Sequence, residues 1–259
     1  MKYRIIAILL FTNTLFSQKG LINYGYIEAL TSGNAKGLDY NSYLVFNKEQ
    51  SYYVTAKDSL ENSQKINEQK IFENDDDSGG TIQNGMKASK HGDQVVFNIK
   101  KNTIWSNILY GEQIYVKEVA PIQNWKIENE TKKIGKFNCK KATTSFRGRN
   151  YTAWFTTDIP LKFGPWKLNG LPGLILEAYD TNKSVFWYFK SVEYPTKSKE
   201  AVQFMKIPVN EKILSYGEFK NLQKKEQEII ADNNIILKKR FPEIEIMKPK
   251  LSQMFIECE

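Results

Sequence analysis

The chain has 259 residues, of which 41% are hydrophobic and 25% are charged, and its formal net charge is +8. This mix permits a packed core and argues against a disordered chain. Lysines and arginines are spread along the sequence, and no basic stripe interleaved with aromatic residues marks a nucleic-acid binder, so we expect no nucleic-acid partner.

The first residues have the pattern of a secretory signal peptide. Two cations precede the apolar run Ile5–Phe11, and the small residue Ser17 suits a cleavage site. The run is much shorter than the roughly 20 residues that cross a bilayer, so no transmembrane segment is expected. We therefore expect residues 1–17 to be removed. Residues 18–259 would form a single exported domain in the periplasm or at the cell surface.

The first part of the body predicts strands and one long interruption. Residues 21–30 and 40–56 alternate aromatic or β-branched residues with polar ones, as half-buried strands do. Residues 57–93 are polar and predict a flexible excursion. The excursion contains the single histidine, His91, and the acidic run Asp75–Asp77, and neither has the spacing of a metal site. We expect no metal and no cofactor.

Strand-like runs resume after the excursion. Arg147-Gly148 lies between two of them and predicts the turn of an antiparallel hairpin. The run Val185–Phe189 is apolar at every position, so it is either a central strand that is buried on both faces or part of an apolar wall. The runs span residues 94–99, 104–108, 113–119, 125–127, 136–146, 149–157, 174–179 and 184–194.

One helix follows the strands. Ser215-x-x-Glu218 is a capping box, and apolar residues from Phe219 to Ile230 recur at helical spacing. We expect Asp232-Asn233-Asn234 to end this helix, with residues 235–237 and 255–256 as short edge strands. The predicted fold is mainly β (α+β): a curved antiparallel sheet, half-barrel-like in one version, with a single C-terminal amphipathic helix on one face.

Residues with reactive side chains give no complete catalytic set. The sequence has no Gly-x-Ser-x-Gly elbow, phosphate loop or dinucleotide fingerprint, so no catalytic residue is assigned. Asp158, Glu177 and Asp180 could supply an acid–base pair if the fold brought two of them together. Cys139 and Cys258 could form a disulfide after export, or Cys139 could simply be packed in the core.

The most unusual segment is Phe163–Ile175, here called the hook. Pro172-Gly173 suits the centre of a type II turn, in which the glycine would take a positive φ. The hook is either a rigid turn that the fold requires or a place where glycines allow a ligand to approach the backbone. The candidate residues are Gly164, Pro165, Gly170, Leu171, Pro172, Gly173, Leu174 and Ile175.

The last six of these residues spell the hexapeptide after which the GLPGLI family is named. Other family motifs occur in the same order, among them Cys139-x-Lys141-Ala142, Phe146-Arg147-Gly148-Arg149 and Ala153-Trp154-Phe155-Thr156. The chain resembles this family most strongly over residues 125–180. The resemblance implies an exported protein of Gram-negative bacteria whose biochemical role is not established and which has no assigned catalytic residues.

Two functional hypotheses follow. The favoured one is a non-catalytic module that binds a small apolar ligand, a peptide or an outer-membrane protein, because aromatic residues make up 13% of the chain and no catalytic set is recognisable. The alternative is an envelope hydrolase that uses carboxylates near the hook.

Overall fold

The structure, a computed structural model, describes residues 19–56, 70–72, 81–83, 92–110, 112–196, 207, 210–243, 245 and 250–259. The predicted signal peptide, His91 and the run Asp75–Asp77 lie outside the described residues, as does most of the predicted excursion. The described parts of the excursion are a short antiparallel pair, β4 (Lys70–Phe72) and β5 (Thr81–Gln83), and its last two residues, Gly92 and Asp93.

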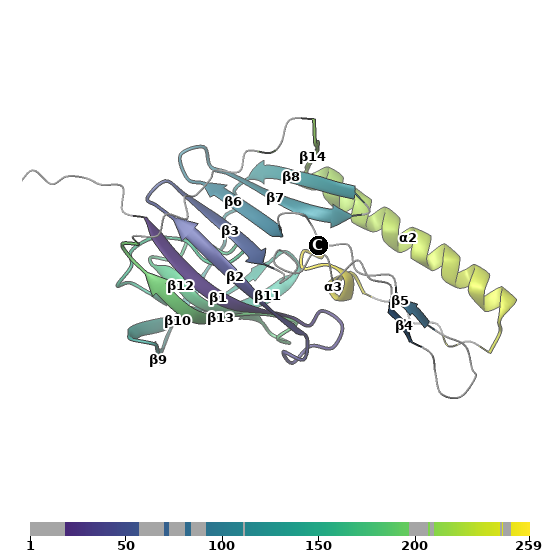
Figure 1. Cartoon of the computed structure of the whole chain (residues 1–259), viewed down its shortest axis with the longest axis horizontal. Coiled ribbons are helices and arrows are strands. Elements are labelled where there is room, and N and C mark those ends of the chain that lie inside the picture. The colour runs from purple at the N-terminus through teal and green to yellow at the C-terminus, as the bar shows by residue number, and fades with distance from the viewer. Residues whose placement is uncertain are drawn as a thin grey trace, which may run out of the picture.

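A single sheet of twelve strands dominates the molecule and confirms the mainly β prediction. Its order is β14-β8-β7-β6-β3-β2-β1-β13-β12-β11-β10-β9. Neighbouring strands are antiparallel except β14, which runs parallel to β8. Figure 1 shows the sheet curving from β8 through β1 and β13 to β9. The strands are β1 (Gly20–Glu28), β2 (Leu38–Phe46), β3 (Gln50–Ala56), β6 (Asp93–Asn98), β7 (Thr103–Tyr110), β8 (Glu112–Val119), β9 (Lys126–Ile134), β10 (Phe137–Phe146), β11 (Arg149–Thr156), β12 (Leu174–Asp180), β13 (Val185–Glu193) and β14 (Lys212–Ser215).

The two faces of the sheet differ because successive side chains point to opposite sides. On β1, Ile22, Tyr24 and Tyr26 are buried on the inner face, where they join the main hydrophobic core. On the outer face Asn23 and Ile27 are half-buried, whereas Leu21 joins a smaller buried cluster with Val45, Tyr52 and Val54. The hook packs against the inner face, where the main core lies.

The predicted hairpin at Arg147-Gly148 is confirmed. β10 and β11 pair through the register Phe146↔Arg149, and the two turn residues take φ values of 52° and 75°. Two successive residues with positive φ are what a two-residue hairpin turn needs.

The predicted helix exists but is longer than expected. α2 (Tyr216–Arg240) begins at the capping box of Ser215 and continues through Asp232 and the two asparagines that follow. Asp and Asn are only mildly unfavourable inside a helix, and Ile235–Leu237 extend it, so the predicted stop was wrong. The edge strand expected at residues 235–237 is therefore helix, and Phe255-Ile256 follow a short helix, α3 (Leu251–Met254), without joining a strand.

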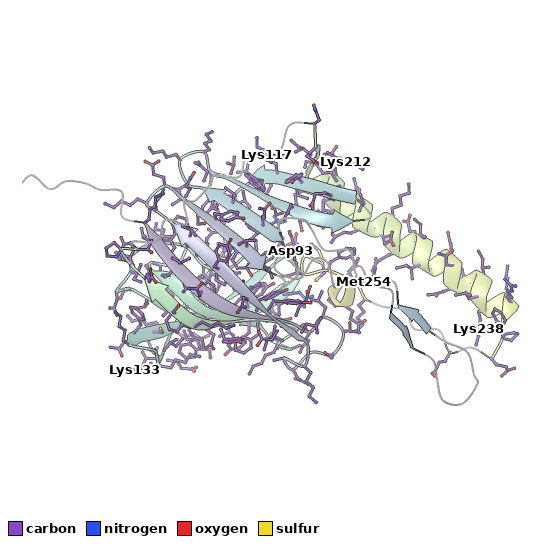
Figure 2. All side chains as sticks on the ribbon, viewed as in Figure 1. Asp93, Lys117, Lys133, Lys212, Lys238 and Met254 are labelled. Atoms are coloured by element: carbon purple, nitrogen blue, oxygen red, sulfur yellow. The ribbon has the colours of Figure 1, made fainter. Side chains whose placement is uncertain are left out.

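Only the first turns of α2 are held by the sheet. Phe219 is buried with Ile114 and Val116 of β8, whereas Ile229 further along is 45% exposed. Figure 2 shows Lys238 at the far end of α2, well away from the strands. The expected packing of the helix on one face is thus confirmed for its N-terminal end. Among the described residues, no helix combines the length and apolarity needed to cross a membrane.

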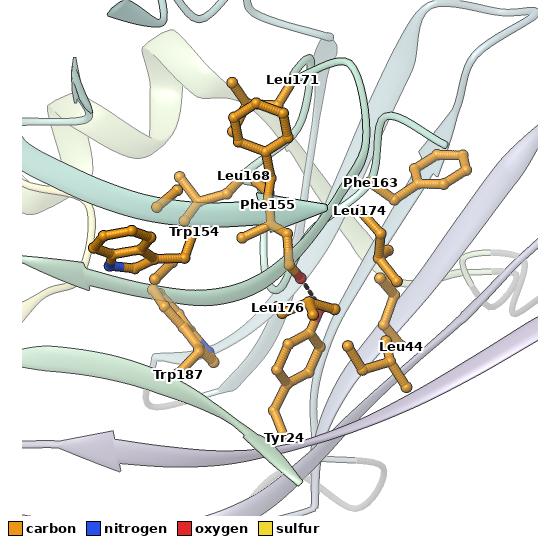
Figure 3. Close-up of a cluster of buried hydrophobic side chains, with 14 of the residues drawn as sticks. Tyr24, Leu44, Trp154, Phe155, Phe163, Leu168, Leu171, Leu174, Leu176 and Trp187 are labelled. Carbon is orange, nitrogen blue, oxygen red and sulfur yellow. Dashed lines mark hydrogen bonds between the residues drawn. The ribbon is translucent and has the colours of Figure 1, made fainter. Parts of the chain in front are cut away.

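The hook fills the inner side of the curved sheet. Leu168, Leu171 and Leu174 are each at most 1% exposed, and full burial of such a side chain contributes about 1.5–3 kcal/mol. Figure 3 shows Phe163 and the three leucines among side chains from the sheet, with Tyr24 donating a hydrogen bond from its hydroxyl to the carbonyl oxygen of Ile175 at 2.6 Å.

The reversal inside the hook occurs earlier than predicted. Gly173 does not have a positive φ; the residues that do are Trp166 (53°) and Gly170 (95°). The amide of Leu168 donates to the carbonyl oxygen of Pro165 at 3.1 Å, which closes the turn there. Pro172-Gly173 instead leads the chain directly into β12, so the predicted type II turn at this dipeptide is wrong.

Candidate functional site

The three carboxylates of the hydrolase hypothesis do not meet. Asp158 is exposed in the turn after β11. Glu177 forms an ion pair with Lys132 at 2.6 Å. Asp180 is 3% exposed, pairs with Arg149 at 2.8 Å and accepts hydrogen bonds from the amides of the β12–β13 turn. Each carboxylate has its own surroundings, and this arrangement provides no acid–base pair.

The two cysteines are free thiols in different parts of the fold. Cys139 lies near the start of β10, while the amide of Cys258 donates to the carbonyl oxygen of Arg147, just beyond the end of that strand. At about 3.3 Å per residue, these positions are more than roughly 20 Å apart, whereas a disulfide needs Cα atoms within about 7 Å. Of the two alternatives for these cysteines, this geometry favours a packed Cys139. Burial raises the pKa of the Cys139 thiol to about 11, so it is a packed rather than a reactive cysteine.

The residues of the predicted hook motif lie mainly in the core. Pro165, Leu171, Leu174 and Ile175 are buried, and Gly173 lies directly against β11. Pro172 and Gly170 are exposed. This placement gives the motif a clear structural role, and a binding role for its glycines stays a prediction.

A group of aromatic and polar side chains lies on the other face of the sheet. We call it the outer aromatic face: Tyr179 of β12, Phe186, Tyr188 and Lys190 of β13, and Asp39 and Asn41 of β2. The strand registers place these residues on one face, because Tyr179 lies opposite Phe186, and Tyr188 and Asn41 both lie opposite Gly25 of β1. The three rings are half-buried.

The rings contact one another in sequence along this face. The ring centroids of Tyr179 and Phe186 are 5.6 Å apart and perpendicular, and those of Phe186 and Tyr188 are 5.8 Å apart. Lys183, in the turn that joins β12 and β13, holds its ammonium 5.4 Å from the centroid of Tyr179. The result is a partly exposed aromatic surface with a cation at one end.

Gly25 explains how Tyr188 reaches its partner. A Cβ atom on Gly25 would lie 2.0 Å from the Tyr188 ring, so only glycine lets this ring lie across β1. The Tyr188 hydroxyl can then donate to Asp39 on the far side, at 2.7 Å. The hydrogen bond to Asp39, with a smaller effect of burial, raises the pKa of Tyr188 to about 12. Beside this pair, Lys190 donates to the side-chain oxygen of Asn41 at 2.6 Å.

The same face continues toward the edge of the sheet. Glu177 lies opposite Trp154 of β11, and Lys132 of β9 places its ammonium 4.4 Å from the Trp154 ring. Trp154 is only 8% exposed and belongs to the main core cluster, so this group borders the outer aromatic face without adding an exposed ring to it. Among the described residues, no group of three or more His, Cys, Asp or Glu could hold a metal ion.

Sequence reasoning missed this surface although the signal was present. The run Val185–Phe189 is apolar at every position, which fits either a buried central strand or an apolar wall. Val185 and Trp187 are buried, while Phe186 and Tyr188 face outward and are half-buried, so the wall alternative is correct. The polar partners come from β2, more than a hundred residues away in the chain, and only the strand order brings them together.

Comparison with known proteins gives a family match over part of the chain. The model that matches is that of the N-glycanase peptide, N-terminal domain, over residues 106–216. Two solved structures of PNGF-II, in the P21 and C2 space groups, match with a TM-score of 0.51 and with 19% and 20% identity. Each match covers 79% of this chain and 32% of that chain, so this chain spans about a third of their length. At this identity the likeness concerns the fold. No curated protein matches the sequence.

These findings correct two expectations. The resemblance to the GLPGLI family is wrong, because the family model that matches is the N-glycanase one, and its residues include the hook. The favoured hypothesis of a non-catalytic module for a ligand, peptide or outer-membrane partner is also overturned, since the family model that matches describes an N-glycanase domain. The hydrolase alternative loses the residues that were offered for it, because Asp158, Glu177 and Asp180 do not meet.

Proposed function

We propose that this chain takes part in the processing of N-linked glycans and that its outer aromatic face engages the sugar. The matched N-glycanase model supplies the substrate class. The observation that carries the proposal is the row of partly exposed rings of Tyr179, Phe186 and Tyr188, flanked by Asp39 and Lys190.

The chemistry of this surface suits a carbohydrate. A sugar ring presents flat C–H faces that pack on aromatic rings, and its hydroxyl groups both donate and accept hydrogen bonds. Asp39 offers acceptor oxygens and Lys190 offers donors at the border of the rings. A few placed polar groups around an apolar surface are what orients a ligand in most binding sites.

The binding assay compares a peptide that carries one N-linked glycan with the same peptide after removal of the glycan. We expect the full chain to bind only the glycosylated form, as measured by isothermal titration calorimetry. Tyr179→Ala and Phe186→Ala should each weaken binding by about tenfold, which corresponds to about 1.4 kcal/mol. Phe241→Ala is the control, because Phe241 is an aromatic residue 46% exposed beyond the end of α2, and it should change nothing.

Two results would contradict the proposal. One is equal affinity for the glycosylated and the deglycosylated peptide. The other is unchanged glycan affinity in folded Tyr179→Ala and Phe186→Ala chains, which would mean that the sugar binds at another surface.

The proposal includes export of the protein, because its glycan substrate would lie outside the cytoplasm. It is supported by the signal-peptide pattern of residues 1–17, which lie outside the described residues. Mass spectrometry of the protein recovered outside the cytoplasm should give a mature chain that begins at Gln18. A cytoplasmic protein that retains Met1–Ser17 would contradict export.

A further inference from the structure

Two buried cations lie on the inner side of the sheet with a single carboxylate from the body of the fold. Lys167 of the hook is 2.9 Å from Glu118 of β8, and Arg147 of the β10–β11 turn also pairs with Glu118. The side chains of Lys167, Arg147 and Glu118 are 0%, 6% and 8% exposed. One carboxylate balances only one of the two cations, and an uncompensated buried charge is strongly destabilising.

The second carboxylate comes from the C-terminal segment, Leu251–Glu259. Glu257 is 2.6 Å from Lys167 and 3.4 Å from Arg147, and its side chain is 3% exposed. With Glu118 and Glu257 together, two carboxylates balance the two cations Lys167 and Arg147. The last residue, Glu259, reaches Arg147 at 3.5 Å but remains 41% exposed.

Arg149 holds the backbone of the same segment. Its Nε donates to the carbonyl oxygen of Ile256 and its Nη2 to that of Phe255, both at 2.9 Å, and Nη2 also donates to Ser252. The Nη1 atom of the same guanidinium pairs with Asp180 and fixes the orientation of the group.

Two further hydrogen bonds hold the C-terminal segment in place. The Cys258 amide donates to the carbonyl oxygen of Arg147 at 3.2 Å, and Gln223 of α2 donates from its side chain to the carbonyl oxygen of Glu257 at 2.8 Å. A Cβ atom on Gly148 would lie 2.6 Å from the Cys258 carbonyl oxygen, so glycine at this turn leaves room for the segment. Main-chain hydrogen bonds plus one side-chain anchor are a common way to recognise an extended peptide.

We propose that Arg147, Arg149 and Lys167 form a binding site for an acidic peptide, and that the chain fills this site with its own C-terminal segment. The ligand class follows from the contacts: a short backbone stretch with a glutamate at the position of Glu257. This site lies on the inner face and is independent of the proposed glycan surface.

The C-terminal segment returns to the sheet only after the chain has left it along α2. α2 starts beside the cations, because Arg147 lies 3.3 Å from the centroid of the Tyr216 ring, and it then extends for about 37 Å. Figure 2 shows Lys238 at its far end and Met254 back beside the sheet. The segment therefore approaches the site from outside the sheet, as a separate peptide would.

The test uses the full-length chain and a fluorescent synthetic peptide with the sequence of residues 251–259. In the Glu257→Gln chain the internal segment has lost its anchoring charge, so the added peptide should compete for the site. We expect fluorescence anisotropy to give at least about tenfold tighter binding of this peptide to the Glu257→Gln chain than to the unmodified chain.

Two controls identify the contact. A peptide with the Glu257→Gln change should bind the Glu257→Gln chain at least about tenfold more weakly than the unchanged peptide does. The Glu259→Gln chain should behave like the unmodified chain, because Glu259 is only partly buried. If a folded Glu257→Gln chain binds the peptide no better than the unmodified chain, the proposal is wrong.

A second measurement covers the case in which Glu257→Gln fails to fold. Hydrogen exchange of the unmodified chain should then show the Phe255–Cys258 amides exchanging faster than those of β10 and β11, because the segment leaves while the sheet stays folded. Exchange of the segment only together with the strands would overturn the proposal, since the segment would then be an inseparable part of the core.

Discussion

Gly173 lies closer to a neighbouring strand than any side chain would allow. A Cβ atom at this position would be 2.0 Å from the carbonyl oxygen of Thr156 and 2.7 Å from its carbonyl carbon. Backbone atoms of a paired strand cannot give way as a flexible side chain can. The glycine is therefore needed for the close approach of the hook to β11, and not for an unusual φ.

Replacing Gly173 tests this explanation. Gly173→Ala should lower the free energy of unfolding by about 1–3 kcal/mol, the usual cost of overfilling a packed region. Urea denaturation followed by tryptophan fluorescence would measure it. Gly217→Ala in α2 is the matched control, because its new Cβ would meet only the Ser215 hydroxyl at 3.9 Å, and it should be neutral or slightly stabilising. Equal effects of the two changes would refute the role of close approach.

The phenol of Tyr188 reports on the outer aromatic face. Its pKa is about 12, chiefly because its hydroxyl donates to Asp39. Since the pKa is higher in the folded protein than the ordinary value of 10, the pair contributes stability below pH 10, and this contribution disappears as the pH rises toward 12.

Asp39→Asn should therefore lower the pKa of Tyr188 toward its ordinary value. Carbon-13 NMR of labelled tyrosine, with Tyr188→Phe to assign the resonance, would follow the titration. A pKa that stays near 12 in Asp39→Asn would mean that burial and not the carboxylate sets it.

At the scale of single elements, α2 depends on its first turn. The Ser215 amide donates to the Glu218 carboxylate at 2.7 Å, and the Glu218 amide donates to the Ser215 hydroxyl at 3.3 Å. Most of the helix beyond Gln223 lacks buried residues, so the cap and the packing of Phe219 anchor it. Fraying should begin at the far end, where packing is absent.

Loss of the Ser215 N-cap should destabilise the protein. Ser215→Ala should lower the free energy of unfolding by about 1 kcal/mol, as loss of an N-cap side chain does. Circular dichroism at 222 nm during urea denaturation would measure it. The same change at Ser252, which lies inside the short helix α3 and is not its N-cap residue, should have a smaller effect.

The cap also predicts a pH dependence. The hydrogen bonds from Ser215 lower the pKa of Glu218 below its ordinary value of 4.5. The contribution of the cap is therefore complete above pH 4.5 and is lost as the pH falls through the lowered pKa. Glu218→Gln should remove this acid dependence of the helical signal; a dependence that persists in Glu218→Gln would assign it to another carboxylate.

Local signals predicted elements well and their ends less well. The capping box located the start of α2, and Arg147-Gly148 located a hairpin, because each depends on a few neighbouring residues. The end of α2 was missed because Asp232-Asn233-Asn234 is a weak stop in the middle of a helix. The role of Gly173 was missed because the contact that requires glycine is with another strand.

At the scale of the whole molecule, the curved sheet separates two surfaces with different chemistry. The inner face holds the hook, the core and the buried pairs of Lys167 and Arg147 with Glu118. The outer face presents Tyr179, Phe186 and Tyr188. Alternation along each strand predicted that two faces would differ, whereas the candidate site also needed the order β2-β1-β13-β12, which joins the first strands of the chain to the late ones and cannot be deduced from local patterns.

The most direct test of the account is a map of where an N-glycan contacts the protein. An N-linked core oligosaccharide would be titrated into protein with carbon-13-labelled Tyr and Phe, and the ring resonances followed by NMR. We predict shifts at Tyr179, Phe186 and Tyr188, and none at the buried inner-face rings of Tyr24 and Phe163. Shifts confined to other rings, or no shifts at saturating sugar, would contradict the assignment of the outer aromatic face.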